Sequence, residues 1–154
     1  MLNPHITILE FLNSNNIPFQ IYEHEPIHTC EQSTQILGVS IKQGAKSLLL
    51  KNEDKFILVI LPGDKKLDSK KLKTTLKTKH LRFATSEEVN MVMGCEIGAC
   101  YPFGNLIGIR MLVDFAMSEN DLITFSPGVR DKSIQVSWAH YFQNVKPEMV
   151  ELAW

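Results

Sequence analysis

The feature that most constrains the fold is a pair of apolar segments separated by a turn signal, SLLLK at 47–51 and KFILVILPG at 55–63. Asn52, Glu53 and Asp54 between them are typical of a tight turn, so the two segments are predicted to form a β-hairpin. The second segment is apolar on both faces, which is typical of a strand that is covered on both sides. It is therefore expected at the centre of a sheet.

Capping residues mark the helices along the chain. Asn3 followed by Pro4 predicts a first helix, because proline is favoured at the first helical position. Thr29 and Gln32 form a capping box for a second helix that ends at Gly38. Further helices are expected after Asp68 or Ser69, from Ser86 and after Ser137, and further strands in FQIYEH, LIGIRMLVD, LITFS and SIQVS.

This order of helices and strands predicts an α+β fold with a mixed central β-sheet and flanking helices, in a single compact domain that covers residues 1–154. The chain is 44% apolar, which is enough for a hydrophobic core at this length. It has no apolar run long enough to span a membrane and no signal-peptide pattern at its N-terminus. A soluble cytoplasmic protein without membrane contact is expected.

Three cysteines, Cys30, Cys95 and Cys100, form no C-x-x-C pair, and an odd number fits a disulfide framework poorly. A reducing compartment is the simpler interpretation. Cys95 and Cys100 could bind a metal together with His28 or His80, but no spacing typical of such a site supports this. Neither a metal nor an organic cofactor is expected.

A lysine stands at the start of the first hairpin strand, directly after Gly44 and Ala45. Side chains alternate along a strand, so Lys46 would share a face with Leu48 and Leu50. If that face is buried, the ammonium group points inward at the mouth of the strand. The alternative is an edge lysine whose charged end reaches water.

Two further segments could bind a ligand. GCEIGACYPFGN, at 94–105, is rich in glycine, which lets another molecule approach the main chain and suits an oxyanion or a sugar edge. An ordinary turn is the alternative. ITFSPGVRDKSIQVS places Ser126, Gly128 and Arg130 in a turn between strands, and without a G-x-S-x-G motif a serine hydrolase is not expected.

A basic segment covers residues 64–82 and contains eight of the sixteen Lys and Arg residues against two Asp. Its formal charge of +6 leaves −7 for the rest of the chain, because the total is −1. Such asymmetry can steer a polyanion to one face of a protein. A solvated helix face is the alternative interpretation.

Taken in order, YEHEPIHTCEQ, GAKSLLL, PGDKKLD, GACYPFG and MLVDFAMSENDLITFSPGVR resemble the YbaK/prolyl-tRNA synthetase-associated domain family over nearly the whole chain. The match is closest at Lys46, at the start of a strand, and at a G-x-x-x-P loop from Gly98 to Pro102. The resemblance implies a small α+β domain that hydrolyses the ester of a mischarged tRNA. It also implies the tRNA acceptor end as partner, and it makes prolyl-tRNA synthetase a candidate partner.

The same resemblance implies the site residues. Lys46 would contact a phosphate or the terminal adenosine, and the Gly98 loop would position the aminoacyl carbonyl and the ribose, without a conventional nucleophile. Ser126 and Pro127 stand where alanine-removing relatives carry His-Pro, and the segment resembles the S-x-G-x-R of the branch that removes cysteine from tRNA for proline. The predicted substrate-binding residues are Tyr22, His28, Cys30, Ala99, Cys100, Tyr101, Pro102, Ser126, Gly128 and Arg130.

The expected function is trans-editing deacylation of Cys-tRNA(Pro), or of another small amino acid on that tRNA. Small side chains differ by only about 1–3 kcal/mol per methylene in a pocket, so the amino acid stays open at this point. One alternative is a non-catalytic module that binds tRNA or a synthetase through the basic helix at 65–79. Another is a thiol enzyme that uses Cys100.

Overall fold

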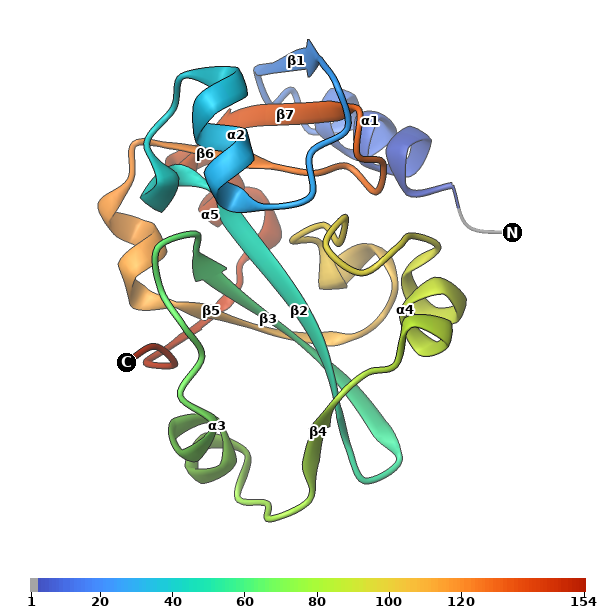
Figure 1. Cartoon of the computed structure of the whole chain (residues 1–154), viewed down its shortest axis with the longest axis vertical. Coiled ribbons are helices and arrows are strands. Elements are labelled where there is room, and N and C mark those ends of the chain that lie inside the picture. Colours follow the sequence, from blue (N-terminus) through green and yellow to red (C-terminus); the bar gives the residue numbers. More distant parts are fainter. Residues whose placement is uncertain (1–2) are drawn as a thin grey trace.

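The computed structural model describes residues 3–154, and within that range it contains five α-helices and eight β-strands (Figure 1). The helices are α1 (Pro4–Ser14), α2 (Cys30–Leu37), α3 (Ser69–Leu76), α4 (Ser86–Met93) and α5 (Trp138–Val145). The strands are β1 (Phe19–Glu23), β2 (Ala45–Asn52), β3 (Lys55–Pro62), β4 (Leu81–Phe83), β5 (Arg110–Asp114), β6 (Leu122–Phe125), β7 (Lys132–Ser137) and β8 (Glu148–Val150). Short 3₁₀ turns occupy η1 (Ile41–Gln43), η2 (Gly104–Leu106) and η3 (Phe115–Glu119).

The capping residues fix the helix ends as the sequence predicts. The Thr29 hydroxyl accepts from the Gln32 amide while the Gln32 side chain accepts from the Thr29 amide, and α2 ends at Gly38 in the left-handed conformation. Asp68 caps α3 and Ser137 caps α5. Helix α4 begins at Ser86 as predicted, and Thr85 caps it in a second capping box.

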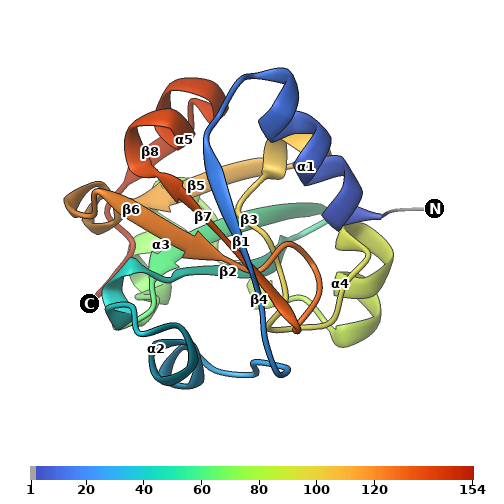
Figure 2. The same cartoon turned by 90° about the horizontal axis from the view of Figure 1, so that it is seen from above.

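The strands form two sheets, where the sequence predicts one central sheet. The larger is mixed, with the order β4-β2-β3-β5-β8, and the predicted hairpin strand β3 is its middle strand. The smaller is antiparallel, with the order β1-β7-β6. It crosses the β2–β3 hairpin at the open end, opposite the turn (Figure 2). Only one isolated bridge, between Gly44 and Thr124, is found between the two sheets in the described residues. The division arises because β1 and β6 both pair with β7 rather than with the hairpin.

Each face of the larger sheet packs against its own hydrophobic core. Leu49, Leu58 and Ile60 face the larger core, which also contains side chains from α1, α4, α5 and the smaller sheet. Leu50 and Leu72 belong to the second core, between the opposite face of the sheet and α3. Burial on both faces explains the continuous apolar run in β3.

The C-terminal tail is attached to the start of α3. The buried Asp114 carboxylate accepts from the amides of Leu152 and Ala153 at 2.7 and 3.0 Å. The amide of Asp68 in turn donates to the Leu152 carbonyl at 2.8 Å. These contacts hold the basic segment against the larger sheet. No helix in residues 3–154 is both long and apolar enough to cross a membrane.

Candidate active site

A cavity of about 410 Å³ opens where the edge of the larger sheet is incomplete. Strand β4 pairs only with Leu50–Asn52, and the bridge to the smaller sheet is made at Gly44. Between these two attachments no strand pairs with the outer edge of β2 in the part of the chain that the structure describes. The remaining walls come from α2, the Gly98 loop and the turn between β6 and β7.

Alternation along β2 aims the main-chain groups of Ser47 at this gap. The Gly63 amide donates to the Gly44 carbonyl, so the main-chain N–H and C=O groups of the even-numbered residues of β2 point towards β3. Those of the odd-numbered residues point to the outer edge, where the Leu49 carbonyl accepts from the Ala84 amide. Ser47 is also odd-numbered, so its main-chain N–H and C=O point away from β3 and into the gap. Its hydroxyl is also buried and has no hydrogen-bond partner in the described residues. Ser47 thus presents its main-chain N–H and C=O to the gap, and its buried hydroxyl lies in the cavity wall without a partner in the described residues.

Lys46 lies on the opposite face, as its spacing predicts, together with Leu48 and Leu50 of the second core. The side chain is half-buried, and Nζ donates to the main-chain carbonyl of Lys65. Burial raises the pKa of the neighbouring Cys30 thiol, and the positive charge of Lys46 partly opposes that rise. Lys46 and Cys30 both line the cavity, so a fixed cation stands at its wall.

The Gly98 loop is held in place by Arg130. The guanidinium pairs with the Glu96 carboxylate at 3.1 Å and donates to the carbonyls of Ile27 and Ile97. Gly98 has φ of +90°, and a Cβ there would lie 3.1 Å from Arg130 Nη1. The positive φ favours glycine at this position, and a side chain there would in addition crowd the guanidinium.

Two thiols lie close together at either end of the same loop. The Sγ atoms of Cys95 and Cys100 are 3.9 Å apart, and Cys100 lines the cavity while Cys95 is buried behind it. The hydrogen bond from Cys95 lowers the pKa of Cys100, and the Gly98 amide adds to that effect. The same contact, together with burial, raises the pKa of Cys95.

The S-x-G-x-R segment forms a clamped turn. The Ser126 hydroxyl donates to the Val129 carbonyl at 2.9 Å. Gly128 has φ of +95°, and a Cβ there would lie only 2.5 Å from Pro4 Cγ of α1. The donors of Arg130 are likewise directed at main-chain carbonyls and at Glu96. Ser126, Gly128 and Arg130 therefore shape the cavity wall through contacts within the protein.

The cavity brings together seven of the twelve predicted site residues: His28, Cys30, Lys46, Gly98, Cys100, Ser126 and Arg130. The other five, Tyr22, Ala99, Tyr101, Pro102 and Gly128, do not line it. Two of these, Tyr22 and Tyr101, were predicted to form the wall of the substrate pocket and lie elsewhere. Tyr22 bonds Gln20 and Gln135 on the smaller sheet, and Tyr101 is in the core, with its hydroxyl donating to the Met93 carbonyl at 2.8 Å. Burial raises the pKa of Tyr101 well above its ordinary value, which keeps the phenol neutral.

Sequence reasoning missed several lining residues. Ser47 follows the predicted lysine directly, but strand alternation places its side chain on the other face of β2. Its place in the cavity wall depends on the gap in the sheet edge, which the sequence does not indicate. Phe83 and Ile97 are apolar, line the cavity and are more than half exposed, at 56% and 52%. An exposed phenylalanine on a three-residue strand carries no periodic signal that would have identified it.

The charge of the cavity limits its chemistry. Lys46, Arg130 and Lys132 line it, and none of its lining residues is Asp or Glu. Arg130 pairs with Glu96 and Lys132 with Asp131, both outside the lining, so Lys46 is the lining cation without an ion pair in the described residues. Such a wall suits an anionic ligand and offers no pair of carboxylates for acid-base catalysis. Within residues 3–154, no group of three His, Cys, Asp or Glu side chains is arranged to hold a metal ion.

Known proteins are similar to this chain in sequence and in fold. A family model described as the aminoacyl-tRNA editing domain matches residues 24–143. A protein of Escherichia coli (strain K12) named multifunctional Ser/Thr-tRNA deacylase ProXp-y is 29% identical over 151 residues, which cover 95% of this chain and 90% of that protein. The proline–tRNA ligase of Bacillus licheniformis is 35% identical over 95 residues, or 61% of this chain and 17% of that enzyme.

Two solved structures have the same fold. The hypothetical protein APE2540 superposes with a TM-score of 0.87 at 18% identity, over 96% of this chain and 99% of that one. A protein proposed as a trans-editing enzyme for prolyl tRNA synthetase also gives 0.87, at 19% identity, over 100% of this chain and 99% of that one. At these identities the likeness shows the fold alone.

Proposed function

Because the chain belongs to the aminoacyl-tRNA editing domain family, we propose that it is a trans-editing deacylase that hydrolyses the ester between a tRNA and a wrongly attached amino acid. The observation that carries this proposal is the cavity at the open edge of β2. It has a cationic wall without carboxylates, and main-chain groups of Ser47 face it. An aminoacylated 3′ end has the complementary chemistry, with anionic phosphates beside a small neutral ester.

Lys46 would bind a phosphate oxygen or the terminal adenosine. An ammonium group has three donors, and the Lys65 carbonyl uses one, so two are left for the substrate. The Gly98 loop would position the aminoacyl carbonyl and the ribose, with Arg130 holding the loop in register. Lys46 and Gly98 line one cavity, which is the arrangement that these roles need.

Hydrolysis would proceed by addition of water to the ester carbonyl carbon. The tetrahedral oxyanion then needs an N–H donor, and the amide of Ser47 faces the gap where such a donor is required. When the C–O bond breaks, the ribose oxygen leaves and takes up the proton that the water has lost. Because the ester is already activated, positioning and oxyanion stabilisation can supply the rate without a carboxylate base.

For the amino acid, we propose serine or threonine. The buried Ser47 hydroxyl has no partner in the described chain, and a hydroxyl-bearing substrate would supply one. Leaving a buried polar group unpaired costs about 1–3 kcal/mol, so alanine would bind less well. The E. coli relative that matches over 95% of this chain is named for the same two amino acids.

Cysteine is the second candidate, on tRNA for proline. Ser126, Gly128 and Arg130 retain the S-x-G-x-R pattern that resembles the cysteine-removing branch, and cysteine differs from serine only in having sulfur in place of the hydroxyl oxygen. Prolyl-tRNA synthetase is the proposed partner enzyme, because part of the proline–tRNA ligase of several bacteria matches this chain.

The test is a deacylation panel. Purified protein is incubated with tRNA(Pro) charged with serine, threonine, cysteine or alanine, and with the cognate tRNAs of the first three amino acids. We expect the fastest hydrolysis with serine and threonine. Faster removal of cysteine would replace the proposed substrate, whereas hydrolysis no faster than in buffer for every substrate would reject the enzyme in favour of a binding module.

A further inference from the structure

The basic segment 64–82 carries most of the uncompensated positive charge of the protein. Among the described residues, ten Lys side chains form no ion pair, and six of them lie in this segment: Lys65, Lys66, Lys70, Lys73, Lys77 and Lys79. The two others of the segment are neutralised, Lys71 by Glu151 at 2.9 Å and Arg82 by Glu88 at 2.7 Å. The free charge is therefore concentrated on one part of the surface.

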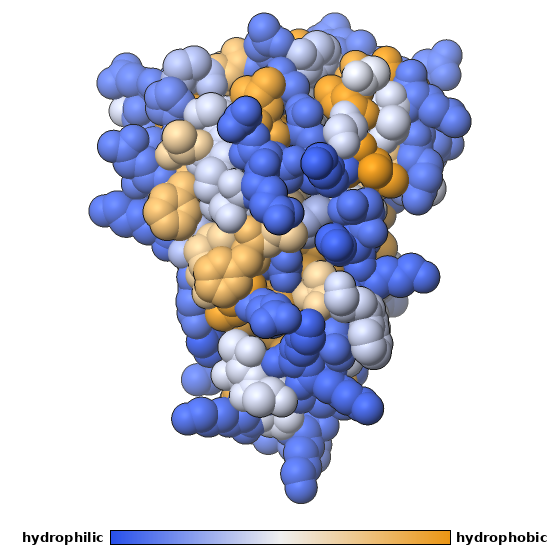
Figure 3. Space-filling view, turned by 90° about the vertical axis from the view of Figure 1, so that its left-hand side faces the viewer, coloured by the Kyte–Doolittle hydropathy of each residue, from blue (hydrophilic) through white to orange (hydrophobic). Residues whose placement is uncertain are grey.

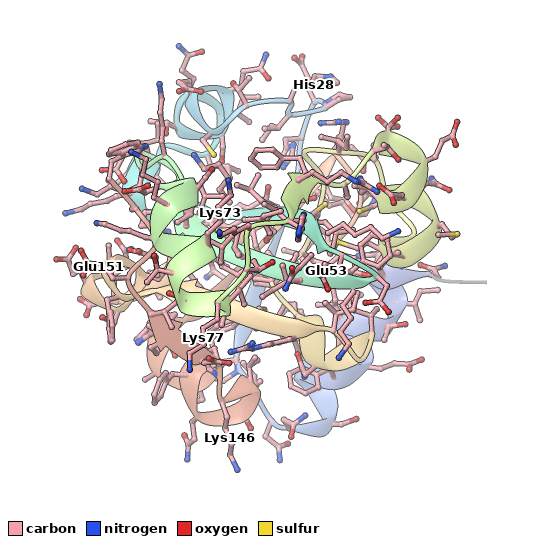
Figure 4. All side chains as sticks on the ribbon, turned by 90° about the horizontal axis from the view of Figure 1, so that it is seen from below. His28, Glu53, Lys73, Lys77, Lys146 and Glu151 are labelled. Carbon is pink, nitrogen blue, oxygen red and sulfur yellow. The ribbon has the colours of Figure 1, made fainter. Side chains whose placement is uncertain are left out.

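Two of these lysines lie on one side of α3, and a third follows at its end. Lys70 and Lys73 are three residues apart in the helix, so their side chains project from the same side, and Lys77 is the C-cap residue directly after Leu76. Leu72 points into the second core and is fully buried, which turns the lysine face outward. Figure 4, in which the molecule is seen from below, shows Lys73 on α3 and Lys77 at the end of that helix. We call Lys66, Lys70, Lys73, Lys77 and Lys79 the basic ridge.

The ridge is joined to the active-site cavity through the main chain. Lys46 donates to the carbonyl of Lys65, the residue that directly precedes the ridge. The next residue, Lys66, accepts at its carbonyl from the Trp154 amide at 3.1 Å, and the Asp68 amide is bound to Leu152. The start of the ridge therefore has a fixed position relative to the cavity wall.

The surface chemistry of the ridge suits a phosphate backbone better than a protein. No large apolar side chain is exposed between residues 64 and 79, and the exposed Trp154 lies beside Lys66 at one end of the ridge, whereas protein interfaces need such side chains at their centre. The lower part of the face in Figure 3, where α3 lies, is mainly hydrophilic, and apolar residues gather above it. Double-stranded RNA is recognised largely through its shape and its phosphates, which lysines on a helix face can contact.

From this arrangement we infer that the basic ridge is a docking surface for the double-stranded acceptor stem of the tRNA. The stem lies along α3 while its single-stranded 3′ end enters the cavity past Lys46. This inference rests on the proposed function for the identity of the RNA. It assigns binding of the stem to the ridge and binding of the ester to the cavity.

The experiment separates these two contributions with a matched pair of variants. K70E/K77E reverses two charges of the ridge, and K55E/K146E reverses two lysines outside it that also form no ion pair in the described chain. Lys77 and Lys146 are both helix C-caps with positive φ, of 54° and 52°, so each pair perturbs one such position. Each protein is assayed on full-length seryl-tRNA and on a 3′-seryl-CCA trinucleotide, which lacks the stem.

We expect K70E/K77E to reduce kcat/KM on the full tRNA by about tenfold or more, because each neutralised phosphate contributes strongly at low salt. The slope of log kcat/KM against log salt should also become shallower, by roughly 0.7–0.9 for each phosphate that the variant no longer neutralises. The trinucleotide should be hydrolysed equally by all three proteins. An equal reduction for K70E/K77E and K55E/K146E on the full tRNA, or an equal reduction of the trinucleotide reaction, would overturn the inference.

Binding of an uncharged acceptor-stem hairpin gives a readout that does not depend on catalysis. Fluorescence anisotropy of the labelled hairpin should show a weaker affinity for K70E/K77E than for K55E/K146E. If the wild-type protein binds the hairpin through the ridge but hydrolyses no ester, the proposed function fails and the docking surface stands. If K70E/K77E hydrolyses the full-length seryl-tRNA as fast as wild type does, and the ridge instead binds an acidic protein, the docking inference alone fails.

Discussion

The ammonium group of Lys46 donates a hydrogen bond to the main-chain carbonyl of Lys65, 19 residues further along the chain. This contact joins the open edge of the larger sheet to the start of the basic ridge. It also fixes the direction of a side chain that would otherwise have several rotamers. A cation held in this way is oriented before any substrate arrives, so less side-chain freedom is lost when it binds a phosphate.

Replacing Lys46 by methionine should abolish most of the deacylase activity. The K46M side chain retains most of the apolar contacts but has no charge or donor, so we expect kcat/KM to fall on the order of a hundredfold. K46R, which keeps the charge, should retain more activity than K46M. Thermal unfolding of both variants checks that the fold is intact. Full activity in a folded K46M protein would remove Lys46 from the mechanism.

Arg130 should act by positioning the Gly98 loop. R130K keeps the positive charge but lacks the planar fork whose Nη1 and Nη2 reach the carbonyls of Ile27 and Ile97, so the loop should loosen. We expect kcat to fall by roughly ten- to a hundredfold, because small misplacements of a bound ester are costly. E96Q is the control: the Glu96 side chain is 76% exposed, and exposed ion pairs contribute little. If E96Q lowers kcat as much as R130K does, the ion pair rather than the loop contacts is responsible.

Glu88 should make the stability of the protein depend on acid pH. The Arg82 guanidinium, followed by the Thr85 amide, lowers the pKa of Glu88 from 4.5 to about 2. Because the folded pKa is the lower one, the stabilisation is present above pH 4.5 and is lost as pH falls towards 2. Urea unfolding between pH 6 and pH 2 should show that wild type is more stable than E88Q at pH 6 and that the difference shrinks with acid. E87Q, at the exposed neighbouring position, should follow the wild type.

Local signals in the sequence predicted the helices and the hairpin well. The capping box of Thr29 and Gln32 and the turn at Asn52 to Asp54 act within a few residues, so their geometry follows from the chain itself. The inward face of Lys46 followed from strand alternation. The comparison with known proteins confirms the family and the fold that the ordered motifs indicated.

Contacts between distant segments were not predictable in the same way. Strands β4 and β8 have three residues each, which is too short for a periodic pattern, and the split into two sheets depends on which strand pairs with β7. Tyr101 belongs to a loop sequence, yet its hydroxyl bonds the end of α4 and its ring is buried. The exposure of Ser47 to the cavity likewise depends on where β4 stops.

Cys100 should be the more reactive of the two paired thiols and should still not be the nucleophile. Its pKa is lowered by the Cys95 hydrogen bond whereas that of Cys95 is raised, so Cys100 forms a thiolate at lower pH. Mass spectrometry after brief treatment with iodoacetamide should find Cys100 modified before Cys95. C100A should keep most of the deacylase activity. Loss of activity on C100A, with normal substrate binding, would instead support the thiol enzyme.

Replacing Ser47 by alanine distinguishes a structural role of its hydroxyl from a role in selecting the substrate. Its hydroxyl is buried without a partner in the described chain, so S47A should unfold no more easily than wild type and can gain up to about 1 kcal/mol. S126A is the matched control at the same cavity, because its hydroxyl donates to Val129 and its removal should cost about 0.5–1.5 kcal/mol. If Ser47 pairs with the substrate hydroxyl, S47A should reduce kcat/KM for seryl- and threonyl-tRNA relative to alanyl-tRNA by about tenfold. An unchanged ratio in S47A would show that another group selects the amino acid, and a stability loss equal to that of S126A would show that the hydroxyl is bonded within the protein.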